Sequence, residues 1–336
     1  MKGQVNFKRF LNRKLLIAAL IALAMLLAVG LFWNSISIPQ NKRLSNYPFD
    51  PQSTLIERIK PIPEPVLAEL KQLDEREDYT PYMPSPGETA AIAAVFETLP
   101  PLNIKVMRER LAAIYFVSNF ISAGYSDWLV NERNEIYTYI VINTTALKTN
   151  ADELLIWKEN SCFINDDSDF EIKISVSPNL KGFMYIMLHE SCHVVDYVLG
   201  ATPFTEPDIK QLRKVPQETD FTRGIWRSYD QSVEYYKFRE NVSFYQEPRV
   251  KISQAESIYR EMSASPFISL YSSLNWAEDL CEFLTFYHLT EKMRLDYKIE
   301  VRQKGKTTYS LRPARQEQVR KRFKNLQVFY ESSWRK

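Results

Sequence analysis

The chain has 336 residues, 45% of them apolar, so it is long and apolar enough to bury a large hydrophobic core. Its net charge is only +2, and it has no long basic face with interleaved aromatic residues outside its termini, so nucleic acid is not an expected partner. Its 8 glycines form no phosphate-binding motif, which disfavours nucleotide chemistry. Its 3 cysteines are too few for a disulfide scaffold, so the core must provide the stability.

The N-terminal region carries the strongest compositional signal. The stretch Leu15–Trp33 contains no charged residue, and at about 1.5 Å per helical residue it is long enough to cross most of the roughly 30 Å hydrocarbon core of a bilayer. Basic residues precede it, so the positive-inside rule predicts a single-pass membrane protein with residues 1–14 in the cytoplasm. The domain after Asn34 is then extracytoplasmic, in a periplasm or at a cell surface. The alternative is a cleaved signal peptide, with Ala28 and Gly30 near the cleavage site.

A polar, proline-bearing region follows at residues 34–62, and we interpret it as a linker that separates the domain from the membrane. The main domain is expected at residues 63–296, and a C-terminal hairpin followed by a basic helix at residues 297–336. Within the main domain, hydrophobic periodicity predicts helices at residues 65–74, 87–99 and 104–121, and strands at residues 135–143 and 169–177.

Two further segments are apolar around most of a helical circumference. The first begins near Asn179 and ends at Gly200, a residue suited to a left-handed C-terminal cap. The second runs from Asn275 to Leu289. Residues 201–262, between them, are polar and rich in aromatic side chains, and we expect them to be mostly helical. Helices that are apolar on nearly every side are buried, so polar residues within them need partners.

His189 and His193 are candidate metal ligands on the first of these helices. Residues four apart lie on one face of a helix, so the two imidazoles point toward one place. Glu190 lies beside that place and can accept a proton from water there, which is why the order H-E-x-x-H on a helix is typical of zinc peptidases. The alternative is a chance match on an ordinary buried helix. Burying an unpaired charge and two polar rings costs several kcal/mol, which disfavours that alternative.

A catalytic zinc needs a third protein ligand and an open position for water. Leu199 stands where the metzincin pattern would place a third histidine, so another segment must supply the ligand. The second helix offers Glu278 and Glu282, four residues apart on one face, so that one can bind the metal while the other supports a histidine. The alternative is a solvated helix edge, which the apolar neighbours of these acids disfavour.

The segments HESCHVVDY (His189–Tyr197) and YSSLNWAEDLCEF (Tyr271–Phe283) together resemble the catalytic domain of anthrax lethal factor and related gluzincin metalloproteases. That family has H-E-x-x-H with an aspartate three residues later, and a further helix of the form Y-x-x-x-N-x-x-E-x-x-x-E. The matching motifs cover under a third of the chain. Carried over residue by residue, the resemblance implies Zn²⁺ as the cofactor, with three ligands: His189, His193 and Glu278.

The resemblance also implies roles for four other residues. Glu190 is the general base, and Tyr271 supports the tetrahedral intermediate. Glu282 supports the ligands from behind, and Asp196 orients the first helix or a ligand histidine. The implied fold class is α+β, a mainly helical zincin-like metalloprotease domain with a small sheet, behind an N-terminal transmembrane helix. The implied function is a membrane-anchored zinc metallopeptidase that acts on a peptide or protein substrate.

Other functions stay open at this point. One is a catalytically inactive zincin-fold binding or assembly protein of the cell envelope, which the intact Glu190 disfavours. Another is hydrolysis of an amide in a non-protein substrate such as a cell-wall peptide. If the substrate is an extended peptide, we expect it to pair with the strand around Tyr139–Asn143.

The sequence departs from the family pattern between the two motifs. A long insertion separates His193 from Glu278, and its aromatic residues are expected to form a lid or a substrate wall. Cys192 and Cys281 each lie within one turn of an expected ligand on the two helices. They either pair in an oxidising compartment or remain buried core residues.

Overall fold

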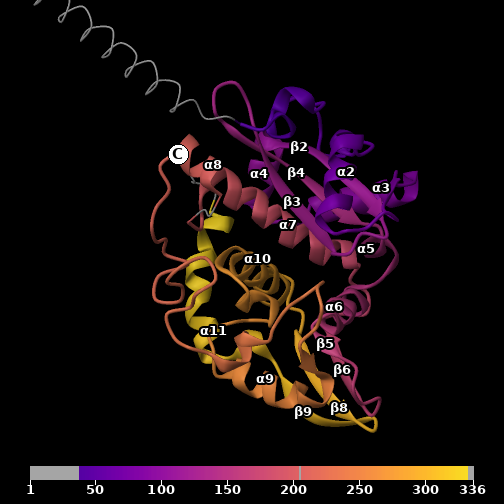
Figure 1. Cartoon of the computed structure of the whole chain (residues 1–336), viewed down its shortest axis with the longest axis vertical. Coiled ribbons are helices and arrows are strands. Elements are labelled where there is room, and N and C mark those ends of the chain that lie inside the picture. Colours follow the sequence, from indigo (N-terminus) through magenta and orange to yellow (C-terminus); the bar gives the residue numbers. More distant parts are fainter. Residues whose placement is uncertain (1–37, 204–205, 332–336) are drawn as a thin grey trace, which may run out of the picture. The chain divides into compact units, whose positions relative to one another are not determined.

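The computed structural model describes residues 38–203 and 206–331 (Figure 1). The predicted membrane segment Leu15–Trp33 lies outside these residues. Among the helices that are described, none is both long and apolar enough to cross a bilayer. Residues Glu206–Lys214 belong to a separate unit, which contains the short helix α8 (Pro207–Leu212). All other elements below belong to the unit formed by Gln40–Thr205 and Val215–Lys336.

The predicted fold class is wrong, because this unit is mixed α/β with several sheets instead of mainly helical with one small sheet. Its largest sheet has the strand order β1-β2-β4-β3. Strand β2 runs antiparallel to β1 and parallel to β4, while β3 pairs antiparallel with β4. The bounds are Thr80–Tyr82 for β1, Leu111–Ser118 for β2, Gly124–Val130 for β3 and Ile136–Asn143 for β4.

The expected long helix at residues 104–121 is also wrong. The helix α4 (Pro101–Arg110) ends at its last arginine, and the chain continues directly as β2. Seven of the eight residues of β2 are buried, so the strand is apolar on both faces and has no alternation that would distinguish it from a buried helix.

The expected linker is part of the folded unit from Gln40 onward. It forms short 3-10 helices, and Ile59 bridges to Ile114 of β2. Arg58 is buried and donates hydrogen bonds to the backbone carbonyls of Met107, Arg108 and Leu111, where α4 ends. The helix α2 (Glu64–Leu73) packs its apolar side on one face of the large sheet.

The helix α7 (Gly182–Leu199) packs against strands β3 and β4 of the large sheet. It also contacts α10 (Trp276–Tyr287), so α7 lies between the sheet and α10 (Figure 1). Gly200 follows α7 with φ of 73°, which confirms the predicted left-handed cap. The helices α3 (Pro86–Phe96), α4 and α5 (Thr145–Lys148) complete the surroundings of α7.

The remaining elements lie on the side of α7 that faces α10 (Figure 1). The helix α6 (Ala151–Asn160) contacts α7 and the strand β6. A three-stranded antiparallel sheet contains β6 (Phe170–Ser175), β8 (Lys298–Gln303) and β9 (Lys306–Leu311), which confirms the C-terminal hairpin. The other elements are the parallel pair β5 (Phe163–Ile164) and β7 (Val250–Lys251), with α9 (Ala255–Ser263), α11 (Glu317–Arg322) and the 3-10 helix η9 (Phe323–Tyr330).

The insertion is not mostly helical. Between residues 215 and 249 the chain forms one short 3-10 helix, η4 (Lys237–Glu240), and otherwise runs as loops. Its aromatic side chains nevertheless enter the core: Trp226 and Phe238 are buried. Aromatic burial therefore organises this segment without regular backbone hydrogen bonding.

Candidate metal centre

The two helices α7 and α10 bring three polar side chains to one place. His189 and His193 are one turn apart on α7, and Glu278 lies in the first turn of α10. Asn275 sets that turn, because its side-chain oxygen accepts hydrogen bonds of 3.0 Å from the backbone N–H groups of Ala277 and Glu278. The Asn275 cap therefore fixes the position in the first turn of α10 from which the side chain of Glu278 extends.

Three donor atoms form a compact triangle. Nε2 of His189 lies 3.0 Å from Oε2 of Glu278 and 3.2 Å from Nε2 of His193. The third side, from Nε2 of His193 to Oε2 of Glu278, is 3.5 Å. A tetrahedral zinc with ligands at about 2.0–2.1 Å separates its ligand atoms by roughly 3.3–3.4 Å. The triangle therefore has the dimensions of one face of such a site, and its donor set of two imidazoles and one carboxylate suits zinc.

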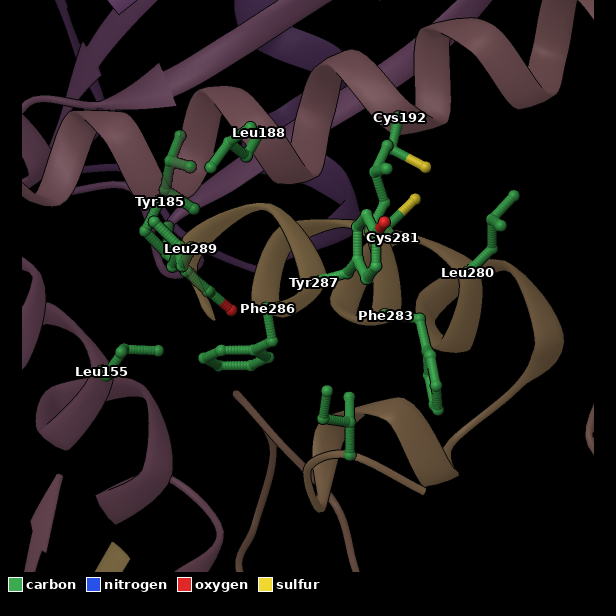
Figure 2. Packing of buried hydrophobic residues seen from close by; sticks show 14 of the residues in the cluster. Leu155, Tyr185, Leu188, Cys192, Leu280, Cys281, Phe283, Phe286, Tyr287 and Leu289 are labelled. Atoms are coloured by element: carbon green, nitrogen blue, oxygen red, sulfur yellow. The ribbon is translucent and has the colours of Figure 1, made fainter. Parts of the chain in front are cut away.

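Cys281 is a second possible partner of the two histidines. Its Sγ and one nitrogen of each imidazole all lie within 4.8 Å of one another. A tetrahedral site with sulfur at about 2.3 Å and nitrogen at about 2.0–2.1 Å needs separations of roughly 3.6 Å, so the grouping with Glu278 is the tighter fit. Cys281 and Cys192 are free, buried thiols whose sulfur atoms point toward each other from α10 and α7 (Figure 2). Burial raises the pKa of the Cys281 thiol well above its usual value.

The carboxylates dominate the electrostatics of the metal-free triangle. Burial lowers the pKa of His189, but hydrogen bonding to Glu278 and the proximity of Glu282 outweigh it and raise that pKa to about 10. The pKa of His193 is also raised, because Glu278 outweighs burial. Burial opposes ionisation of Glu278, yet the two imidazoles hold its pKa well below the usual range. The site therefore attracts positive charge, which protons supply when no metal is bound.

Glu282 lies behind the triangle and is fully buried. Its Oε1 is 3.2 Å from Nδ1 of His189, an ionic contact that is not aligned as a hydrogen bond. The same oxygen accepts hydrogen bonds from Lys158, at 3.1 Å, and from the hydroxyl of Tyr185, while Oε2 accepts one of 2.6 Å from Ser269. Burial raises the pKa of Glu282, but Lys158 and His189 outweigh it and lower that pKa to about 2.

Glu190 faces the strand β3. Its Oε2 accepts a hydrogen bond of 2.7 Å from the Ser126 hydroxyl. A Cβ at Gly124 would lie 2.6 Å from Oε1 of Glu190, so any larger residue at this position would force the carboxylate to shift. Burial raises the pKa of Glu190, against the opposing effects of the two histidines and of Ser126. A buried carboxylate with a raised pKa beside this triangle of possible metal ligands is suited to accept and return a proton.

Tyr271 and two residues of the insertion form an aromatic wall beside the triangle. The ring centroid of Tyr271 is 5.9 Å from that of His189. Phe244 and Tyr245 pack against Tyr271, with ring centroids 4.9 and 6.2 Å away. Tyr245 adopts a left-handed backbone, with φ of 59°. These contacts bring two aromatic residues of the insertion beside Tyr271, and their expected role as a lid or a substrate wall stays a prediction.

Asp196 lies on α7 beyond the triangle. Its carboxylate accepts hydrogen bonds of 2.6 Å from the backbone N–H and from the hydroxyl of Thr202. These bonds tie the turn after Gly200 to the end of α7. Both expected roles of Asp196, orienting the helix or a ligand histidine, stay predictions.

Four residues close to the site were not predicted from the sequence. Gly124 and Ser126 lie on β3, a strand whose apolar pattern is too weak to recognise. Lys158 and Tyr185 come from α6 and α7. The signal that was overlooked is a lysine directly after the apolar run Leu154–Trp157 of the segment ADELLIWKEN, since a buried lysine needs a partner.

Comparison with known proteins returns no matching family model, no matching curated protein and no matching solved structure. Function is therefore inferred from the chemistry of the site.

Proposed function

We propose that the chain is a zinc metallopeptidase of the gluzincin type, in which His189, His193 and Glu278 hold the metal. The observation that carries the proposal is the triangle of donor atoms 3.0–3.5 Å apart, with the buried carboxylate of Glu190 on the neighbouring residue of α7.

The charges around the triangle support a divalent cation. Three carboxylates, of Glu190, Glu278 and Glu282, surround the site, and Lys158 is the ammonium group that contacts one of them. Metal binding requires both imidazoles to be neutral. The three carboxylates then outnumber the single ammonium group of Lys158 by two charges. A buried excess of negative charge is costly, and a divalent cation removes it.

Each residue then has a defined task. Zinc held by the three ligands would act as a Lewis acid and make water nucleophilic at neutral pH. Glu190 accepts the proton of the attacking water and later gives it to the leaving amine. Tyr271 donates its phenolic proton in a hydrogen bond to the developing oxyanion, a contribution of about 2.7–4 kcal/mol for one donor.

The position of the substrate differs from the sequence-based expectation. Strand β4, with Tyr139–Asn143, has β2 on one side and β3 on the other, so it has no free edge for a substrate. Strand β3 is at the edge of the sheet and carries Gly124 and Ser126 beside Glu190. In this proposal an extended peptide adds to β3 at the end that contains Gly124.

The test uses the full-length chain and its Glu190→Gln variant. We expect both to bind about one zinc per chain, measured by elemental mass spectrometry, and only the wild type to cleave a diverse peptide library. Glu109→Gln, an exposed substitution on α4, is the matched control and should cleave like the wild type. A wild-type chain that holds zinc and cleaves no peptide would favour the inactive binding protein, and cleavage of other amides alone would favour a non-protein substrate.

A further inference from the structure

Lys158 is a buried cation next to the metal centre. It lies near the end of α6, and its side chain is only 3% exposed. A lysine is rarely so buried unless it is paired. Its Nζ donates a hydrogen bond of 3.1 Å to Oε1 of Glu282 and is also hydrogen-bonded to the hydroxyl of Tyr185. Three helices, α6, α7 and α10, therefore meet at one ammonium group.

The same ammonium group contacts the residue assigned to the oxyanion. Nζ of Lys158 lies 4.3 Å from the ring centroid of Tyr271 and 5.0 Å from that of Tyr185. Both distances are within the roughly 6 Å over which a cation is attracted to an aromatic face. Lys158 therefore contacts Glu282, which supports the ligand His189, and it also contacts the ring of Tyr271. It is not itself one of the three residues of the triangle.

The carboxylate of Glu282 depends on the charge of Lys158 to keep its position. The carboxylate is fully buried, and its contacts with Tyr185 and Ser269 are hydrogen bonds from neutral hydroxyls. Without Lys158, the nearest groups that can balance its charge are the histidine and the metal. The carboxylate would then move toward them and disturb the triangle. The three ligand atoms would lose the geometry that zinc requires.

We propose that Lys158 is a positioning residue that keeps Glu282 at its distance of 3.2 Å from Nδ1 of His189 and supports the ring of Tyr271 from one face. This inference rests on the proposed metal site. One buried charge then fixes the relative positions of the ligand His189 and the oxyanion donor Tyr271. Metal affinity and turnover therefore depend on the same side chain.

The first test measures zinc affinity by competition with a chromophoric chelator. Lys158→Met keeps an unbranched side chain but removes the charge, and we expect its zinc affinity to fall by about 10–100-fold. Lys173→Met removes a lysine that is 43% exposed on β6 and should bind zinc within about twofold of the wild type. Wild-type zinc affinity in a folded Lys158→Met chain would overturn the proposal.

The second test uses turnover at saturating zinc. Lys158→Met should lower kcat with KM within about threefold of the wild type, because the substrate does not touch Lys158. If Lys158 acts through Tyr271, the combined variant with Tyr271→Phe should lose much less than the product of the two single losses. Losses that multiply fully would show that Lys158 does not act through the phenol.

A third comparison covers the case in which Lys158→Met does not fold. Lys158→Arg keeps the charge and the contact with aromatic faces, whereas Lys158→Gln keeps only a hydrogen-bond donor. We expect zinc affinity to decrease from wild type to Arg to Gln, and equal affinity of Arg and Gln variants would contradict the role of the charge. The affinity measurements need no substrate, so they stand even if the chain cleaves no peptide, whereas an absence of zinc binding in the wild type would count against the metal site itself.

Discussion

Gly124 of β3 lies directly against Glu190 of α7, and a Cβ at position 124 would be 2.6 Å from Oε1 and 2.9 Å from Cδ of the glutamate. Both contacts are shorter than atoms tolerate, and the glutamate is buried, so the carboxylate cannot simply move into solvent. The sheet thus sets the position of Glu190, the proposed general base, by steric contact as well as by the hydrogen bond from Ser126.

Gly124→Ala should displace Glu190 while leaving the three ligands in place. We expect kcat to fall by about 10²-fold, as for a base misplaced by about 1 Å, with zinc content unchanged. Overpacking should lower the free energy of unfolding by about 1–3 kcal/mol. Gly87→Ala on α3 is the matched control, because a Cβ there meets nothing within 4 Å. Steady-state kinetics and denaturant unfolding check both variants, and wild-type kcat in Gly124→Ala would refute the steric role.

Ser126→Ala should change the pH dependence of catalysis. The hydrogen bond from Ser126 favours the ionised form of Glu190 and lowers its pKa, so its loss raises that pKa. The proposed base must be ionised to act, so the acid limb of the kcat/KM profile should move to higher pH. An acid limb that stays in place, or moves to lower pH, would show that Ser126 does not stabilise the carboxylate.

Zinc binding should release protons. In the metal-free site the pKa of His189 is about 10, so at pH 7 this imidazole carries a proton that the metal must replace, and the raised pKa of His193 acts in the same direction. We expect about one proton or more released per zinc at pH 7, and an apparent affinity that rises with pH up to about pH 10. Calorimetric titration in buffers of different ionisation enthalpy measures the number. His193→Ala should release fewer protons, and release near zero in the wild type would contradict the charge argument.

Glu159 should make stability depend on pH. It is buried on α6, and its Oε1 accepts a hydrogen bond of 2.5 Å from Tyr259. Burial raises its pKa to about 7, against the opposing effects of Tyr259 and Lys158. Between its ordinary pKa of 4.5 and about 7, the folded state keeps a proton that the unfolded state releases, so stability falls as pH rises through this window.

The loss should approach about 3 kcal/mol above pH 7, and Glu159→Gln should remove it. Denaturant unfolding of the metal-free protein at several pH values measures the difference between variant and wild type. Glu109→Gln, which is exposed, serves as the control and should follow the wild-type pH dependence. An identical pH dependence in Glu159→Gln and the wild type would rule out this role.

Parts of the fold were predictable from local patterns. The strand β4 and the hairpin of β8 and β9 were expected within a few residues, and Gly200 ends α7 as expected. Strand β2 was mistaken for a helix, because a strand buried on both faces has no alternation of apolar and polar residues. The polar segment from Gln40 was mistaken for a linker, since nothing local indicates that Arg58 binds the carbonyls at the end of α4.

The spacing of His189 and His193, and of Glu278 and Glu282, follows from helix geometry alone, so the sequence by itself determined which residues share a face. Only the tertiary structure decided which faces meet. Nε2 of His189 and Oε2 of Glu278 lie 3.0 Å apart across 89 positions of the chain, and Lys158 reaches Glu282 across 124 positions. Such contacts depend on how α6, α7, α10 and the sheet pack, and packing is set by many side chains together, which periodicity within one segment does not encode.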